Sequence, residues 1–175
     1  TLMREPNTQV VARAMTALDG ELREAPPDCR FFFEVALRRA PDLRTVQALA
    51  RVLGVVPSSL MSRFYRSQLP SPKTYLAFAR LLHAAYLFRC GGHSIADVAN
   101  RLDYSSPQSF GRHLREFLGV TAGEFRRRMP FDTAVERFRE RLVTPYRDRL
   151  LAFHPFGTWP GDHGQSTARA AGPAG

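Results

Sequence analysis

The stretch that decides the fold covers residues 94–128 and reads SIADVANRLDYSSPQSFGRHLREFLGVTAGEFRRR. Its first part predicts a short helix, because Ser94 can cap a run of apolar residues at helical spacing. Those apolar residues are Ile95, Val98, Ala99 and Leu102. After a turn through Asp103, Ser106 can cap a second helix and Pro107 suits its first turn. The stretch therefore predicts two short helices joined by a tight turn.

The same arrangement occurs about 50 residues earlier in the chain. The apolar residues of the first helix recur, with an offset of 49, as Val46, Leu49, Ala50 and Leu53. The second helices share an inward-facing pair of residues, with an offset of 50. These pairs are Leu60 with Phe64 and Phe110 with Leu114. Gly54 suits the left-handed backbone of a tight turn, and Pro57 suits a helix start. We interpret the two stretches as an internal repeat of a helix-turn-helix.

A long helix is expected between the two repeats, over about residues 72–90. Ser71 can cap it, Pro72 suits its first turn, and Gly91 with Gly92 can end it. A helix of this length is a rod of roughly 28 Å, since each residue adds about 1.5 Å. The predicted fold is therefore all-α, with two homeodomain-like helix-turn-helix subdomains joined by a long linking helix.

These patterns divide the chain into four regions. Residues 1–40 are expected to be a helical remnant or linker of a missing or truncated N-terminal region. Residues 41–129 are expected to form one domain. Its parts are helix-turn-helix units over about 45–68 and 94–118, the linking helix over about 72–90 and a final helix over 121–128. Residues 131–154 have the apolar spacing of amphipathic helices. Eight of the 21 residues from 155 to 175 are Gly or Pro, which indicates a disordered tail.

The net charge of +9 predicts affinity for a polyanion. Between residues 41 and 129, thirteen Lys and Arg stand against five Asp and Glu, so this segment carries +8 of the total. Twelve of the thirteen are Arg, whose guanidinium can form paired hydrogen bonds with a phosphate or a guanine. A solvated basic surface, or a genome that favours arginine codons, would give the same excess.

A basic helix-turn-helix repeat points to double-stranded DNA. In this motif the second helix lies in the major groove and the first helix crosses above it. The second helices are expected here over 57–68 and 106–118. The rod between them approaches the ~34 Å that separates successive major-groove faces on one side of B-DNA, so both helices could read adjacent segments. The linking helix could also simply bridge two halves of a core.

Residues 45–128 resemble the DNA-binding domain of the AraC/XylS family of bacterial transcription regulators. The resemblance is carried by LARVLGVVPSSLMSRFYR, by SPKTYLAFARLLHAAYLF and by residues 94–128, most specifically by YSSPQSF at 104–110. Members of this family have two helix-turn-helix units joined by a long helix. The resemblance implies a bacterial, cytoplasmic protein that binds promoter DNA as a monomer or dimer and contacts RNA polymerase.

The resemblance also implies which side chains meet DNA. Base-reading roles fall on Ser58, Met61 and Ser62 in the first unit and on Pro107, Gln108, Ser109, Gly111 and Arg112 in the second. Phosphate-binding roles fall on Arg63, Arg66, Ser106, His113 and Arg115. The chemistry agrees, because Gln can pair with adenine, Arg with guanine, and Met can touch a thymine methyl. Gly costs up to about 1 kcal/mol relative to Ala inside a helix, which close approach to DNA would explain at Gly111.

The sequence departs from the family pattern at four places. Val56 stands where a capping Ser is usual, and Asp103 stands where the second turn usually has Gly. Leu69-Pro70 replaces a Gly before the long helix, and Ala122 replaces a common Pro. The first unit also has few long polar side chains on its second helix. We therefore expect the second unit to carry more of the sequence specificity.

Other classes of protein have less support. The five His form no acid–base or metal constellation, and Cys29 and Cys90 lie far apart, so no enzyme, cofactor or metal site is expected. No stretch is apolar for long enough to span a membrane. The main alternative is a degenerate helix-turn-helix module that acts in protein–protein interaction or binds DNA non-specifically; RNA binding is a third. The helices of 131–154 are expected to dock on the protein's own core, although a homodimer through them is also open.

Overall fold

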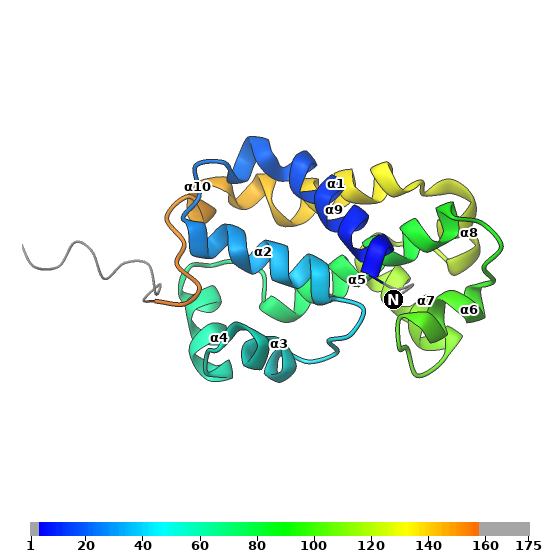
Figure 1. Cartoon of the computed structure of the whole chain (residues 1–175), viewed down its shortest axis with the longest axis horizontal. Coiled ribbons are helices and arrows are strands. Elements are labelled where there is room, and N and C mark those ends of the chain that lie inside the picture. The colour runs from blue at the N-terminus through cyan, green and yellow to red at the C-terminus, as the bar shows by residue number, and fades with distance from the viewer. Residues whose placement is uncertain (1–3, 158–175) are drawn as a thin grey trace, which may run out of the picture.

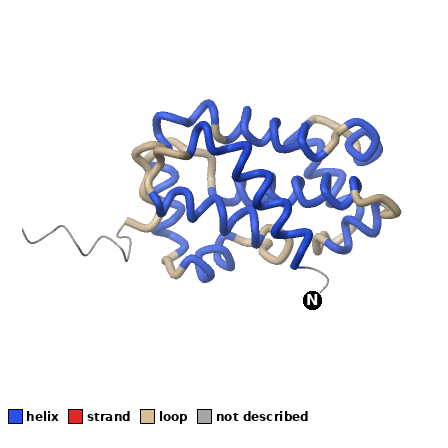
Figure 2. Tube along the Cα trace, turned by 45° about the horizontal axis from the view of Figure 1, so that its top comes forward, coloured by secondary structure: helices blue, strands red, loops and turns tan. Residues whose placement is uncertain are grey.

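Helix α5 (Pro72–Arg89) runs through the middle of the protein, and the other helices are arranged around it (Figure 1). The computed structural model describes residues 4–157, which contain helices and loops but no strand (Figure 2). The helices before α5 are α1 (Arg4–Leu22), α2 (Pro27–Arg39), α3 (Val46–Leu53) and α4 (Pro57–Arg66). Those after it are α6 (Ile95–Arg101), α7 (Pro107–Leu118), α8 (Ala122–Arg128), α9 (Phe131–Leu142), the 3-10 turn η1 (Thr144–Tyr146) and α10 (Arg147–Leu150). The prediction of an all-α fold is confirmed.

Helices α3 and α4 form the first helix-turn-helix, called the first unit below. Thr45 caps α3 by accepting a hydrogen bond from the Ala48 amide at 3.1 Å, so this helix begins at Val46. Gly54 ends it with φ at +69°, as the sequence predicted for the turn. Helix α4 then begins at Pro57 with no side-chain cap, because Val56 offers no acceptor. It ends at Arg66, two residues before the expected boundary.

Helices α6 and α7 form the second helix-turn-helix, the second unit, with the same backbone plan. Ser94 and Asp97 make a capping box at the start of α6. Asp103 takes the place of Gly54 in the turn, with φ at +58°. The next amide, that of Tyr104, donates to the Ala99 carbonyl at 2.9 Å, just as Val55 donates to Ala50 in the first unit. The two turns are therefore equivalent, and Asp103 has a backbone conformation that favours glycine.

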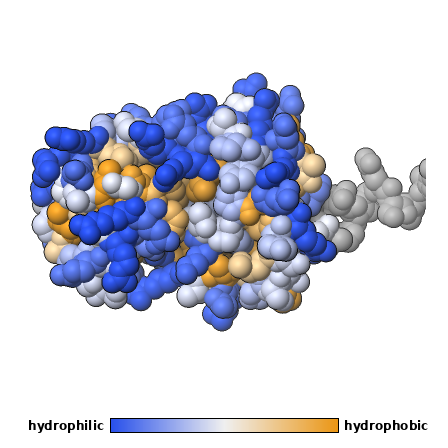
Figure 3. All heavy atoms as spheres, turned by 180° about the vertical axis from the view of Figure 1, so that it is seen from behind, coloured by the Kyte–Doolittle hydropathy of each residue, from blue (hydrophilic) through white to orange (hydrophobic). Residues whose placement is uncertain are grey.

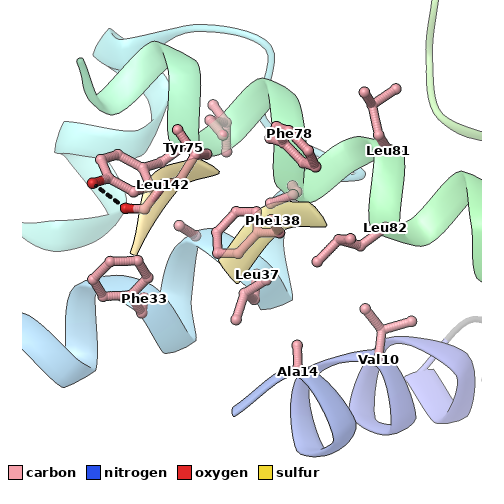
Figure 4. Close-up of a cluster of buried hydrophobic side chains, with 14 of the residues drawn as sticks. Val10, Ala14, Phe33, Leu37, Tyr75, Phe78, Leu81, Leu82, Phe138 and Leu142 are labelled. Carbon is pink, nitrogen blue, oxygen red and sulfur yellow. Dashed lines mark hydrogen bonds between the residues drawn. The ribbon is translucent and has the colours of Figure 1, made fainter. Parts of the chain in front are cut away.

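The core is built on α5, in which twelve of eighteen residues are buried. Its aromatic residues meet rings from α2, α4 and α9: Tyr75 packs edge-on to Phe33, and Phe78 packs edge-on to Phe138 (Figure 4). The Tyr75 hydroxyl donates to the Leu142 carbonyl at 2.8 Å, which satisfies a polar atom inside this apolar cluster. On the outside, hydrophilic side chains surround separate smaller apolar areas on the face seen from behind (Figure 3).

Helices α1, α2 and α9 share this core with α5. Val10 and Ala14 of α1, Leu37 of α2 and Phe138 of α9 are all essentially inaccessible to solvent. In Figure 1, α1 and α9 lie along one edge of the molecule, while the first and second units lie at opposite ends of its long axis. Residues 1–40, interpreted from sequence as a remnant or linker, thus contribute two helices that pack with α5. The helices of 131–154 dock on the same core.

Helix α10 and the segment that follows it pack against the first unit and against the start of α2. Phe153 packs edge-on to Phe64 of α4, with 4.7 Å between ring centroids. Arg149 donates to the Gln68 carbonyl at 2.9 Å, just past the end of α4. His154 Nδ1 lies 3.1 Å from the buried carboxylate of Asp28 at the start of α2. Most of the tail expected over 155–175 lies outside the described residues, which end at 157.

A buried histidine in α5 predicts a pH dependence of stability. His83 is 3% exposed, and burial lowers its pKa from 6.5 to about 4. Its Nε2 lies 2.6 Å from the Leu37 carbonyl, which can only accept, so Nε2 carries a hydrogen. Below pH 6.5 the unfolded chain takes up a proton that the folded protein excludes. The free energy of unfolding should therefore fall by about 3 kcal/mol as the pH drops from 6.5 to 4.

His83→Gln tests this assignment, because the amide keeps a donor near Nε2 but does not titrate. Urea unfolding from pH 7 to pH 4 should lose less stability in this variant than in the wild type. The comparison isolates His83, since any contribution of other groups is common to both proteins. Parallel pH curves for the two proteins would contradict the assignment.

Candidate nucleic-acid interface

Helix α4 presents a mostly small or apolar outer face. Leu60 and Phe64 are buried, which turns the opposite side of the helix to solvent. The residues exposed there are Ser58, Met61, Ser62, Tyr65 and Arg66. Met61 is 41% exposed and Tyr65 is 83% exposed, values that are unusual for large apolar or aromatic side chains in a stable surface helix. This face can offer apolar contact and one exposed cation, but few groups that recognise a base by hydrogen bonds.

Helix α7 presents a longer and more polar face. Phe110 and Leu114 are its buried pair. Pro107, Gln108, Arg112 and Arg115 are exposed, while Ser109 and Gly111 are half-buried. Gln108 and Arg112 are four residues apart, so they lie one helical turn apart on the same face. An amide and a guanidinium at this spacing can donate and accept hydrogen bonds on neighbouring base edges.

The residues expected to bind phosphate differ in how free they are. Arg66 and Arg115 are exposed. Ser106 accepts a hydrogen bond from the Ser109 amide at 3.1 Å, so its oxygen caps α7. Arg63 donates to the Pro155 carbonyl at 3.2 Å and is pressed against Gly157, where an added Cβ would clash with its guanidinium. The structure therefore directs Arg63 toward the C-terminal segment.

His113 is held on the flank of α7 that faces α5. Its Nδ1 lies 3.1 Å from the Tyr104 hydroxyl, and its ring packs edge-on to Phe117. Burial, followed by the charge of Arg80, lowers the pKa of His113, which favours the neutral ring. Burial raises the pKa of Tyr104 to about 12, so the hydroxyl stays protonated and can donate to Nδ1. With Nδ1 accepting, the Nε2–H of His113 is available as a donor.

Arg80 joins the two units through α5, and the sequence analysis did not identify it. Its guanidinium is 6% exposed and donates from Nε to the Ala40 carbonyl at 3.2 Å and from Nη2 to the Leu43 carbonyl. The same group lies 5.4 Å from the centre of the Tyr104 ring in the second unit. One buried cation thus contacts both the segment leading into α3 and the turn of the second unit.

A second link between the units is an ion pair near the surface. Arg44 precedes α3, and its Nε lies 2.7 Å from Oδ2 of Asp103 in the second turn. This guanidinium is the main cause of the lowered pKa of Asp103. The side chains are 51% and 62% exposed, so solvent screens the pair and it contributes little stability. Its effect is to bring a carboxylate into the space between the two units.

The described residues contain no group of three or more His, Cys, Asp or Glu side chains able to hold a metal ion. Cys29 is buried, and burial raises its pKa to about 12, which makes it a poor nucleophile. None of the described helices combines the length and apolar character required to cross a membrane.

Comparison with known proteins agrees with this geometry. A family model described as "Helix-turn-helix domain" matches residues 49–128, which run from α3 to the end of α8. Residues 49–128 thus match a helix-turn-helix domain of the AraC type, and this segment is called the AraC-type domain below. The matched segment contains most of the first unit, the whole of α5 and the second unit, and domains of this type bind DNA.

Part of the chain is also similar to a curated protein. The chain is 28% identical to the "Lactose operon transcription activator" of Staphylococcus xylosus over 82 residues. The alignment covers 47% of this chain but only 29% of that protein. No solved structure matches the chain at a significant level.

Gly111 in the AraC-type domain allows a direct test of DNA approach. It lies within α7, and an added Cβ would meet no protein atom within 4 Å. Gly111→Ala should therefore raise the free energy of unfolding by about 0.5–1 kcal/mol, because alanine loses less backbone entropy in a helix. If DNA approaches this backbone closely, the same variant should bind its DNA site more weakly than the wild type.

Gly20→Ala provides the matched control. Gly20 is also helical and also has no atom within 4 Å of an added Cβ, but it lies in α1, outside the AraC-type domain. Urea unfolding and fluorescence anisotropy with labelled DNA would measure the two effects. Unchanged DNA affinity in a stabilised Gly111→Ala protein would remove the argument for close approach.

Proposed function

We propose that this protein binds a bipartite site in double-stranded DNA in a sequence-specific manner and regulates transcription from promoters that contain the site. Helices α4 and α7, called the reading helices, would enter two adjacent segments of the major groove. The observation that carries the proposal is the repeat itself: two equivalent units joined by α5, with one outer face of each second helix left open. The eighteen residues of α5 make a rod of about 27 Å, comparable with one turn of B-DNA.

The two reading helices would contribute differently. On α7, Gln108 suits adenine and Arg112 suits guanine, so this helix would carry most of the base discrimination. On α4, Met61 would contact a thymine methyl, with Ser58 and Ser62 as the small polar neighbours. Pro107, Ser109 and Gly111 would complete the base-facing surface of α7. Arg66 and Arg115 are the best-placed phosphate ligands, because both are exposed.

Several further features of a regulator are part of this proposal. Regulation would involve contact with RNA polymerase at a bacterial promoter, in the cytoplasm, where the DNA is found. The relative's printed description as a transcription activator supports a role in transcription. A homodimer would double the number of half-sites read. The family type is that of DNA-binding regulators, which supports a non-enzymatic role.

A second function is favoured by one observation. Four of the exposed large apolar or aromatic side chains belong to the first unit or its turn: Val52, Val56, Met61 and Tyr65. Exposed apolar side chains on this unit would suit a protein partner better than a base edge. In that case the second unit would bind DNA and the first would act mainly in protein–protein interaction.

Selection of binding sites from a random DNA pool, followed by titration with salt, separates these functions. Two half-sites about one helical turn apart would support reading by both helices. Enrichment of one half-site alone would support the second function for the first unit. Binding without any enriched motif, lost uniformly with salt, would reject sequence-specific regulation.

Arg112→Ala should weaken binding to the selected site by about 1–3 kcal/mol and relax the base preference at one position. Arg141→Ala removes the same charge from α9, outside the AraC-type domain, and serves as the control. Anisotropy titrations on the selected site and on single-base variants measure both effects. Equal, sequence-independent losses in the two variants would assign Arg112 to general electrostatics.

A further inference from the structure

A pocket of about 220 Å³ lies between the first and second units, against α5. Its walls come from the segment before α3, from α5 and from the second unit. The side chains that matter chemically are Arg44, Lys73, Arg80, Asp103, Ser109 and His113. Arg44, Lys73 and Asp103 are exposed, so the pocket can be reached from solvent.

The pocket is positively charged. Three cations, Arg44, Lys73 and Arg80, face one carboxylate, Asp103, which leaves a charge of +2 with His113 neutral. Asp103 forms its ion pair with Arg44, and the more distant charge of Arg80 also lowers the pKa of this carboxylate. The Arg80 guanidinium donates hydrogen bonds to two backbone carbonyls and also lies against the Tyr104 side chain.

Burying a guanidinium is costly, and here one carboxylate is shared with Arg44, so a second anion nearby would offset part of that cost. Lys73 adds a flexible point charge at the mouth of the pocket. His113 can contribute the Nε2–H that remains when Nδ1 accepts from Tyr104. Cations and neutral donors that converge in this way form a binding site for a tetrahedral oxyanion.

We propose that this pocket binds one phosphate group, supplied by the DNA backbone between the two half-sites. The proposal rests on the proposed function, since DNA read by α4 and α7 would have to pass the space between the units. The backbone that separates two adjacent major-groove segments is the part of the duplex nearest to that space. A free phosphate ion has the same chemistry and is the other source that the experiment distinguishes.

Asp103 regulates this site by opposing the anion. Its carboxylate lies in the pocket wall and holds Arg44 at 2.7 Å. Its backbone has φ at +58°, a conformation that asparagine also tolerates. Asp103→Asn therefore removes the negative charge without changing the turn, and it frees Arg44 for the phosphate. Lys73→Ala instead removes a positive charge from the pocket, at an exposed position in the first turn of α5.

The experiment uses the full chain and duplexes in which single phosphates are replaced by neutral methylphosphonates across the segment between the half-sites. In the wild type, one position should weaken binding about 3- to 10-fold. In Lys73→Ala that position should have little further effect, and the slope of log K against log salt should fall by about 1. Asp103→Asn should bind more tightly than the wild type. Arg141→Ala, with the same loss of charge on α9, should keep the wild-type methylphosphonate profile.

A parallel arm adds inorganic phosphate to the protein without DNA and follows the amide resonances of Ser105 and Ser109. Saturable shifts that disappear in Lys73→Ala, without any methylphosphonate effect, would assign the pocket to free phosphate. Neither a local methylphosphonate effect nor saturable phosphate binding would overturn the proposal. If no DNA motif is selected, the proposed function fails. The titration with inorganic phosphate then decides by itself whether the pocket binds a phosphate group.

Discussion

Helix α5 is in contact with α1, α2 and α9 as well as with both helix-turn-helix units, and its burial is the constraint that orders the rest of the structure. Each fully buried leucine or phenylalanine contributes about 1.5–3 kcal/mol, and α5 supplies several of them. Each reading helix has only two buried residues, Leu60 with Phe64 and Phe110 with Leu114. Short helices of this kind take their orientation from the surface on which they dock. The position of each outer face therefore depends on α5 together with the other helix of its unit.

The two units are equivalent in backbone but not in how they are held. The second unit has side-chain caps on both helices and a polar outer face. The first has no cap on α4, exposes Met61 and Tyr65, and is braced by the segment after α10 through Phe153 and Arg63. Extra bracing where the local signals are weak is consistent with the general rule that tertiary packing can replace helix propensity. It also directs one arginine of α4 away from the expected phosphate-binding surface.

The parts of the fold that sequence predicted are those encoded by neighbouring residues. Serine caps, proline starts and apolar spacing located α4 to α8 within a few residues, because each signal acts within one turn of helix. The role of α1 and α2 was not predicted, since their amphipathic pattern does not say which surface they cover. The outward residues of α4 and α7 followed from their buried pairs. The pocket between the units did not, because Arg44, Lys73, Arg80 and Asp103 are brought together only by the packing of distant segments. A polar Arg80 and His83 within the apolar run of α5 were the one local hint.

The shared core of α1, α2, α5 and α9 has a consequence for how this molecule can be taken apart. A boundary drawn on motif alone, at residues 41 and 129, cuts through contacts that cover one side of α5. Such a fragment would expose Leu82, Phe78 and Tyr75 to water and would become prone to aggregation. Heat would melt the reading helices together with the flanking helices in a single cooperative transition. The part of the protein that could be transferred intact to another protein is therefore the whole described chain. The two helix-turn-helix units need α1, α2 and α9 because these helices cover α5.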